Sequence, residues 1–218
     1  MGLALAESIK RQGELELVGI WQRGQDIDPL VAAADVVVDF SLPLGTERVI
    51  DAAVRHSKPL VCGVSGLDER QSVLLAAACE EIPVVYDRNM SLGIAVLERS
   101  VREAASTLGE EFEVSVSEVH HVHKKDSPSG TALKLGEAIA AARGAAGTSG
   151  VQFDMERRGE VPGDHAVTMR SAAEKLTFSH SVTTRQVFVD GALRAAGWVA
   201  DRPAGRYSMQ DVLFGHLE

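Results

Sequence analysis

Cysteine is nearly absent from this sequence. Its 218 residues include only two, Cys62 and Cys79, and no C-x-x-C pair. This count makes a disulfide framework improbable and offers no spacing suited to a zinc knuckle. A globular fold must therefore be held by its own core.

Long apolar runs and a secretory leader are also lacking. The longest apolar stretches, such as Leu74–Cys79, are far shorter than the roughly 20 residues that a membrane-spanning helix needs. Residues Met1 to Ser8 lack the basic flank and apolar core of a signal peptide. We therefore expect no membrane association and a cytoplasmic location.

Positive charge is in deficit. The chain has 31 acidic and 22 basic residues, a net charge of −9, which disfavours nucleic-acid binding through bulk charge. Any anionic ligand must meet a local basic cluster. The composition is otherwise that of a soluble globular protein, with 45% apolar residues, 24% charged residues and a mean hydropathy of +0.01.

The first part of the chain alternates short β-branched runs with amphipathic stretches, which is typical of a parallel α/β sheet. A helix is expected to begin almost at Met1. The expected strands are Leu15–Trp21, Asp35–Phe40, Pro59–Cys62 and Pro83–Tyr86. The expected helices between them are Thr46–Arg55 and Asp68–Cys79, while Gln22–Pro29 is interpreted as a short polar link.

After Asn89 the pattern changes to one typical of an α+β domain with a mixed sheet. The expected helices are Leu92–Leu108, Thr131–Ala142, Gln186–Val199 and Ser208–Leu213. The expected strands are Glu113–His121, Val151–Arg157, His165–Arg170 and Lys175–Val182. We thus expect a first domain of residues 1–89 with 200–218 and a second domain of residues 90–199.

The densest chemistry lies between Glu118 and Ala132. Five of the six residues from His120 to Lys125 are His or Lys, which makes a local positive pocket in an acidic protein. The segment Pro128–Thr131 then leads into a helix, whose first N–H groups favour an anion such as a carboxylate.

Two other interpretations of this cluster remain open. His121 and His123 would share one face of an extended strand and could ligate zinc or iron. Against that, Lys124 and Lys125 would repel a cation and no third soft ligand is near, so no metal ligand is assigned. The cluster could also be a solvated polar loop.

The pattern E-x-H-H-x-x-K-x-D-x-P-S-G-T-A, from Glu118 to Ala132, closely resembles the active-site stretch of the 4-hydroxy-tetrahydrodipicolinate reductase family. Further resemblances follow in the family's order at Asp39–Thr46, Gly63–Gly66, Asn89–Gly93 and Gly163–His165. The resemblance implies a Rossmann-type parallel sheet domain, an α+β substrate and oligomerisation domain with a mixed sheet, and a homotetramer.

The resemblance also implies an activity. The family reduces a cyclic unsaturated dicarboxylate of the diaminopimelate route to lysine, with NADPH or NADH as the hydride source. It makes His120 the proton donor, with Lys124 acting beside it, and His121 the ligand of one substrate carboxylate. The positions that grip the other carboxylate are Ser129, Gly130 and Thr131.

The cofactor residues implied by the resemblance follow three expected strands, at the edge where α/β sheets bind ligands. They are Phe40, Ser41, Gly63, Val64, Ser65, Arg88, Asn89 and Met90. Each is by itself a common strand-to-helix turn, and their joint position favours the functional interpretation.

The sequence departs from the family pattern in three places. Of the first strand and its glycine-rich loop only Met1 and the cofactor candidate Gly2 remain, which predicts weak dinucleotide binding if that strand is absent. Gln22 stands where the family has an acidic residue, and Arg23 after it would tolerate or favour the 2′-phosphate of NADP, unless Arg23 is an ordinary surface charge. The chain is also shortened around Pro162 and Gly163, where the family carries a further strand of the subunit interface, and this argues against the expected tetramer.

Two other functions remain open. The chain could be a catalytically silent relative that binds a dicarboxylate or a partner through the His-Lys cluster without holding the cofactor. It could also reduce a different cyclic imine acid, because the matching residues grip carboxylates and not the rest of a ring.

Overall fold

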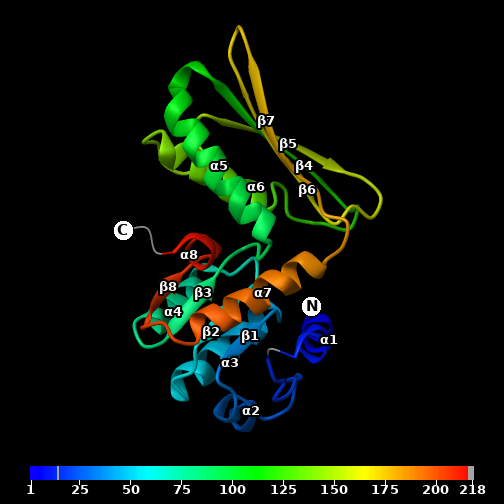
Figure 1. The fold of residues 1–218 in the computed structure, drawn as a ribbon, viewed down its shortest axis with the longest axis vertical. Coiled ribbons are helices and arrows are strands. Elements are labelled where there is room, and N and C mark those ends of the chain that lie inside the picture. Colours follow the sequence, from blue (N-terminus) through cyan, green and yellow to red (C-terminus); the bar gives the residue numbers. More distant parts are fainter. Residues whose placement is uncertain (14, 216–218) are drawn as a thin grey trace. The chain divides into compact units, whose positions relative to one another are not determined.

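The chain forms two units, each with its own sheet and core (Figure 1). The computed structural model describes residues 1–13 and 15–215. The first unit is Met1–Leu92 together with the chain from Gln186 onward, and the second is Gly93–Arg185.

The first unit is built on a parallel sheet of four short strands in the order β1-β2-β3-β8. The strands are β1 (Val37–Asp39), β2 (Leu60–Cys62), β3 (Pro83–Tyr86) and β8 (Gly205–Tyr207). The three residues of β2 are fully buried, as expected for a central strand with helices on both faces.

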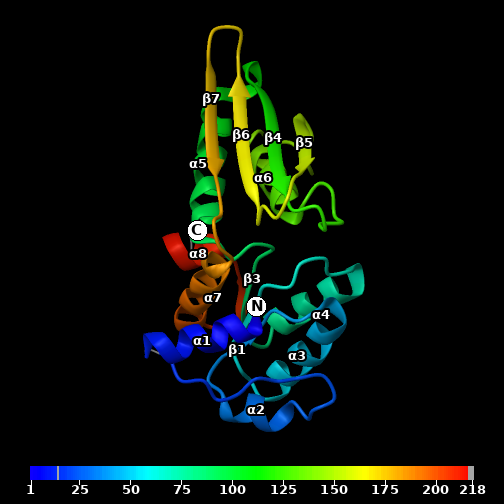
Figure 2. The same cartoon turned by 90° about the vertical axis from the view of Figure 1, so that its right-hand side faces the viewer.

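Helices cover both faces of this sheet (Figure 2). They are α1 (Gly2–Gln12), α2 (Asp28–Ala33), α3 (Pro43–Arg55), α4 (Glu69–Cys79), α7 (Gln186–Val199) and α8 (Met209–Phe214). Leu60 and Cys62 of β2 share a core with α3 and α4, while α7 lies on the opposite face with α1 against it. Asp68 starts α4 through a reciprocal capping box with Gln71.

The second unit is a mixed sheet covered on one face by two helices. Its strands, in the order β5-β4-β6-β7, are β5 (Val151–Arg157), β4 (Glu113–His120), β6 (Asp164–Arg170) and β7 (Lys175–His180). Only the β4–β5 pair is parallel. The other elements are α5 (Leu92–Leu108), the short 3-10 helix η1 (Gly109–Glu111) and α6 (Gly130–Ala142).

This sheet buries its alternate residues against α5 and α6. Val114 and Val116 of β4 pack with Val167 and Met169 of β6 in that core. The two-residue period continues along β4, so Glu118 and His120 are buried too. Two polar side chains therefore extend the apolar face of the strand.

Most predicted elements are confirmed. The helices α5 and α7 and the strand β5 begin and end at the expected residues. Strand β3 also matches its expected range, and β1 and β2 lie within theirs. The remaining predicted helices and the other three strands of the second unit agree within a few residues. Of the helices in the described residues, none combines the length and hydropathy that a bilayer crossing requires.

The expected strand Leu15–Trp21 is wrong. This segment is irregular, and the side chains of Leu15, Val18 and Ile20 are 37%, 48% and 40% exposed. A pocket of about 580 Å³ lies between the segment and β1. A strand needs a paired neighbour, and β1 is an edge of its sheet that pairs with β2 alone among the described strands.

Three short elements have no counterpart among the predictions. Helix α2 lies partly in the segment interpreted as a polar link, and neither β8 nor η1 was expected. Each has six residues or fewer, too short for its periodicity to stand out in a sequence.

Helix α7 belongs to the first unit, whereas the expected boundary placed residues 186–199 in the second domain. The physical reason is close packing. Gly191 of α7 lies so near Met90 that a Cβ atom there would clash with the Met90 carbonyl oxygen. Residues 216–218 of the expected first domain lie outside the described residues.

Candidate functional site

The polar centre of the second unit is the carboxylate of Glu118, which is 1% exposed. The backbone N–H of Ser129 donates to both of its oxygens at 3.2 Å. Arg157 Nη1 of β5 donates to Oε1, also at 3.2 Å. The guanidinium offsets the cost of burying a carboxylate.

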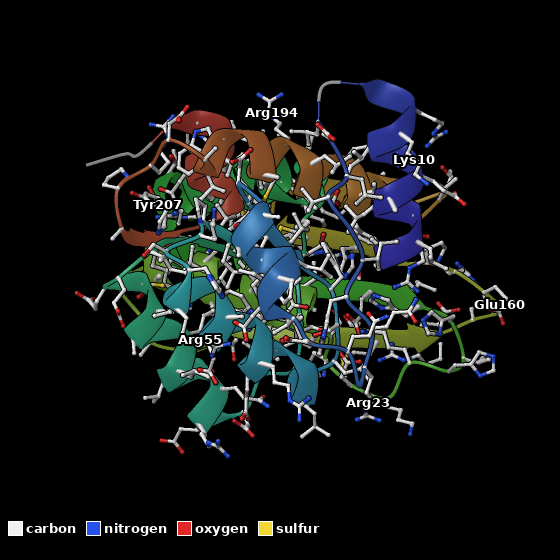
Figure 3. All side chains as sticks on the ribbon, turned by 90° about the horizontal axis from the view of Figure 1, so that it is seen from below. Lys10, Arg23, Arg55, Glu160, Arg194 and Tyr207 are labelled. Atoms are coloured by element: carbon white, nitrogen blue, oxygen red, sulfur yellow. The ribbon has the colours of Figure 1, made fainter. Side chains whose placement is uncertain are left out.

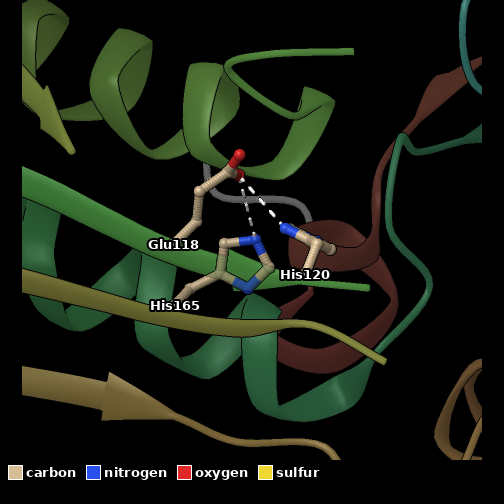
Figure 4. A group of neighbouring side chains, drawn as sticks. All are labelled: Glu118, His120 and His165. Carbon is tan, nitrogen blue, oxygen red and sulfur yellow. Dashed lines mark ion pairs between the residues drawn. The ribbon is translucent and has the colours of Figure 1, made fainter. Parts of the chain in front are cut away.

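Two imidazoles face the same carboxylate (Figure 4). His120 Nδ1 lies 3.6 Å from Glu118 Oε2, and His165 Nε2 of β6 lies 3.8 Å from it. The two rings meet edge to face with their centroids 5.0 Å apart. Both side chains are buried, so this is a closed cluster of one acid and two histidines.

Burial makes both histidines poor bases. It lowers the pKa of His120, an effect that the charge of Glu118 partly opposes and those of Lys124 and Arg157 reinforce. It lowers the pKa of His165 to about 3, helped by the charges of His120, His180 and Lys124. His165 is therefore neutral near pH 7, and His120 is shifted toward its neutral form.

The loop from His121 to Pro128 is tied to this centre. Arg157 donates from Nη2 to the Asp126 carbonyl at 2.6 Å and from Nε to the Lys124 carbonyl at 3.4 Å. Lys124 Nζ lies 2.8 Å from Asp126 Oδ1. Burial would raise the pKa of Asp126, but the hydrogen bond and charge of Lys124 lower it.

The start of α6 completes the site. Ser129 is the N-cap, and its hydroxyl oxygen accepts the Ala132 N–H at 3.1 Å. A backbone hydrogen bond from Gly130 also acts on the Asp126 carboxylate. Lys124 and the first turn of α6 thus already hold one carboxylate, as a cation beside a helix N-terminus is suited to do.

The structure brings most of the predicted substrate residues together. His120, Ser129 and Thr131 are buried, while His121, Lys124 and Gly130 are partly exposed around them. Both Lys124 and Gly130 contact Asp126. His121 directly follows β4.

The premise of the metal alternative at His121 and His123 is wrong. Strand β4 ends at His120 and a turn follows, so these two residues do not share a strand face. Their ring centroids lie 6.1 Å apart, and His123, whose side chain is 74% exposed, pairs with Glu160.

A different trio has ligand-type atoms within 4.8 Å of one another, namely Glu118, His120 and His165. Both Glu118 oxygens already accept N–H groups, and Arg157 adds a positive charge beside them. These donors and this charge disfavour a divalent cation there.

Four residues of the centre were missed as functional by sequence reasoning. Glu118, Asp126 and His165 lie inside the quoted motifs, but no role was assigned to them. The two-residue spacing of Glu118 and His120 was an available signal, because it puts both on one strand face. Arg157 had none, since it reaches the site only through the pairing of β5 with β4.

The cofactor candidates lie at one edge of the first unit's sheet, where β1, β2 and β3 end. Phe40 and Ser41 follow β1, Gly63–Ser65 follows β2, and Arg88–Met90 comes shortly after β3. Gly63 packs under the Phe40 ring, where an added Cβ would lie 2.5 Å from ring carbons. Gly63 thus lets the Phe40 ring pack directly against the backbone where β2 ends.

Two other cofactor candidates are placed differently. Gly2 opens α1 and lines the 580 Å³ pocket together with Phe40 and Ser41. Arg23 lies on an exposed turn at the surface of the first unit (Figure 3) and does not line that pocket.

Comparison with known families gives two matches. Residues 1–90 match the model described as dihydrodipicolinate reductase, N-terminus, and residues 93–213 match the model for the C-terminus. Together they cover nearly the whole chain.

Curated relatives extend these matches. A 4-hydroxy-tetrahydrodipicolinate reductase of Zymomonas mobilis is 38% identical over 98% of this chain and 92% of the relative. One of Wolinella succinogenes is 42% identical over 86% and 80%, respectively. The solved dipicolinate-bound dihydrodipicolinate reductase from Paenisporosarcina sp. TG-14 superposes with a TM-score of 0.77 at 19% identity, covering 97% of this chain and 95% of that one.

Proposed function

Because the chain belongs to the dihydrodipicolinate reductase family, we propose that it reduces 4-hydroxy-tetrahydrodipicolinate to tetrahydrodipicolinate with a nicotinamide cofactor. This reaction belongs to the diaminopimelate route to lysine. The substrate is a small cyclic dicarboxylate, in keeping with the ligand named for the Paenisporosarcina protein.

One observation in the site carries the proposal. Lys124 Nζ at 2.8 Å and the first turn of α6 already bind the carboxylate of Asp126. A substrate carboxylate would meet the same donors. An acidic chain of net charge −9 needs such a local cationic site to hold a dianion.

The proposed roles follow from this placement. His120 gives a proton to the ring and Lys124 stabilises the developing negative charge beside it. His121 holds one substrate carboxylate. The other carboxylate is held by the residues at the start of α6, namely Ser129, Gly130 and Thr131.

The first unit, Met1–Leu92 with the chain from Gln186 onward, is proposed to bind the cofactor, and the second unit, Gly93–Arg185, the substrate. The cofactor supplies the hydride. Parallel strands β1, β2 and β3 end at one edge of the sheet, and that edge is where α/β folds bind nucleotides. Arg23, with Gln22 in place of an acid, supports a preference for NADPH.

The test is oxidation of NADPH or NADH, followed at 340 nm, with freshly generated substrate. Turnover that requires the substrate supports the proposal. Cofactor binding without turnover would identify a silent relative, and turnover only with another cyclic imine acid would change the substrate. A fluorescence titration of each reduced cofactor measures the two affinities, and equal values would remove the preference for NADPH.

We also propose that the protein works as a homo-oligomer, a tetramer by analogy with its family. Helices α5 and α6 cover one face of the second unit's sheet, which leaves the other face available for a second copy. Light scattering at micromolar concentration tests this, and a mass of one chain would contradict it.

A further inference from the structure

Glu118 is the group on which the buried polar side chains of the second unit converge. Its Oε1 faces Arg157, and the Ser129 N–H lies between both oxygens. Oε2 also faces two imidazoles: His120 Nδ1 lies 3.6 Å from it and His165 Nε2 lies 3.8 Å from it. Which of the two rings points a proton at Oε2 decides which nitrogen of each ring stays basic.

The hydroxyl of Ser129 bears on this question for His165 in the resting protein. Its oxygen accepts the Ala132 N–H at 3.1 Å, so its own proton needs an acceptor elsewhere. His165 Nε2 lies 3.4 Å away and can accept it. In that arrangement neutral His165 carries its proton on Nδ1, which makes no hydrogen bond in the described part of the chain, and it offers none to Glu118.

His120 is then the ring that points a proton at Glu118. Its Nδ1 is buried and makes no hydrogen bond in the described part of the chain, and Glu118 Oε2 lies 3.6 Å from it. A carboxylate oxygen accepts only, so a short inward movement would close a bond from Nδ1–H. The other nitrogen, Nε2, lies next to Gly163, 3.0 Å from where a Cβ atom would be.

We propose that Glu118 is a positioning residue, which keeps the proton of neutral His120 on Nδ1 and so leaves Nε2 as the nitrogen that exchanges protons with a bound ligand. This rests on the role proposed above for His120. When Nε2 takes a proton from water, the carboxylate faces the resulting imidazolium and stabilises it. Transfer of that proton from Nε2 to the substrate returns the neutral ring.

The charges around His120 are consistent with this arrangement. The charges that act on it are those of Glu118 and Asp126, which favour its protonated form, and those of Lys124 and Arg157, which oppose it. His165, which touches its ring, stays neutral near pH 7. Loss of the Glu118 charge would therefore lower the pKa of His120 further.

The first test is the tautomer of His120 in the resting protein. Long-range ¹H–¹⁵N correlation spectra of histidine-labelled protein distinguish Nδ1–H from Nε2–H, and a His120→Gln variant assigns the signal. We expect Nδ1–H in the neutral ring, whereas free histidine prefers Nε2–H. In Glu118→Gln an amide N–H can face Nδ1, and the proton should move to Nε2.

A matched control is Glu156→Gln, which removes the same charge from an exposed side chain on the neighbouring strand. It should leave the tautomer unchanged. An Nε2–H tautomer of His120 in the parent protein would overturn the proposal. This result does not depend on whether Glu118→Gln folds, because only the His120→Gln variant is needed, to assign the signal. The same tautomer in folded Glu118→Gln as in the parent would overturn it too.

The second test is the pH dependence of turnover. In Glu118→Gln, kcat should fall about tenfold or more, while KM changes little because the substrate donors remain. The decline of kcat with rising pH should move to lower pH, and Glu156→Gln should follow the parent profile. An unshifted profile would contradict the proposal, whereas a parent protein without turnover but with the Nδ1–H tautomer would refute only the proposed function.

Discussion

Lys124 is the cation that the structure places best for a substrate carboxylate. Its side chain is 22% exposed and engaged with Asp126, whereas the adjacent Lys125 is exposed. In Lys124→Gln, kcat/KM for the cyclic substrate should fall about 100-fold or more. Lys125→Gln removes the same charge one residue away and should stay within about threefold, since exposed charges contribute little.

Steady-state kinetics at low ionic strength measures both variants. Similar losses in both would mean that the loop acts through its summed charge alone. The assignment of Lys124 as the specific group beside His120 would then be wrong.

Gly163 sets the space around the outer nitrogen of His120. Its φ is +150°, and a Cβ there would lie 3.0 Å from His120 Nε2. Gly163→Ala should lower kcat about tenfold to 100-fold, because a small displacement of a reacting group is costly. Gly159→Ala is the control: its φ is also positive, at +49°, but nothing lies within 4 Å of its Cβ position.

The comparison separates backbone strain from contact with the ring. Thermal melting should show some loss of stability in both variants, and assays should show the loss of kcat in Gly163→Ala alone. Equal activities in the two variants would contradict the argument.

The sequence revealed the ligand-facing residues better than the groups behind them. His120, Lys124 and Ser129 stand in one short motif, so the residue types and their spacing indicated an anion site. Arg157 and His165 reach the same place through strand pairing. Register between distant strands is a property of the folded sheet that no local pattern contains.

Among the elements, α7 depends most on a single small residue. Gly191 meets the Met90 carbonyl so closely that Gly191→Ala would force the helix and the chain after β3 apart. We expect a loss of about 3 kcal/mol or more in the free energy of unfolding. Gly197→Ala, on the exposed face of the same helix with nothing within 4 Å, should gain about 0.5–1 kcal/mol from helix propensity.

Urea denaturation of both variants tests this pair. A Gly191→Ala protein as stable as the parent would show that α7 can shift away from Met90 at little cost. That result would also weaken the assignment of α7 to the first unit.

The one expected strand that does not form, Leu15–Trp21, failed for a physical reason that did not affect the helices. The 17 residues of α5 repeat their apolar period several times within one segment. The apolar run Leu15–Trp21 satisfies the local preferences of a strand equally well, yet it lies across a pocket from β1 without pairing. Strand formation depends on a partner, and local propensity cannot supply one.

At the scale of the whole molecule, the acidic composition and the basic site are compatible because the positive charge is local. The chain carries −9 overall, yet the second unit pairs Arg157 with the buried carboxylate of Glu118 and Lys124 with the exposed carboxylate of Asp126. Composition alone therefore indicates no site for an anion. The net charge pointed to an anionic ligand only when it was combined with the local motif of histidines and lysines.

The buried histidines make the stability of the protein depend on pH. In the unfolded chain a histidine has a pKa of about 6.5, whereas burial lowers that of His165 to about 3 and also lowers that of His120. At pH values between the folded and the unfolded pKa, the unfolded chain binds more protons than the folded chain does. The contribution of the neutral buried histidines to stability is therefore complete above about pH 6.5 and is lost as the pH falls toward 3. Each such histidine should remove up to about 1.4 kcal/mol per pH unit.

Urea denaturation between pH 7.5 and 4.5 measures this slope. His165→Gln should make the dependence of stability on pH less steep, because an amide does not titrate in this range. The groups that pack against His165, namely Glu118, Ser129 and His120, are unchanged in this variant. His123→Gln, whose parent side chain is 74% exposed, should keep the parent slope. Identical slopes in the parent and His165→Gln would mean that His165 titrates in the folded protein as it does in water, and the closed acid-histidine cluster would then be open to solvent.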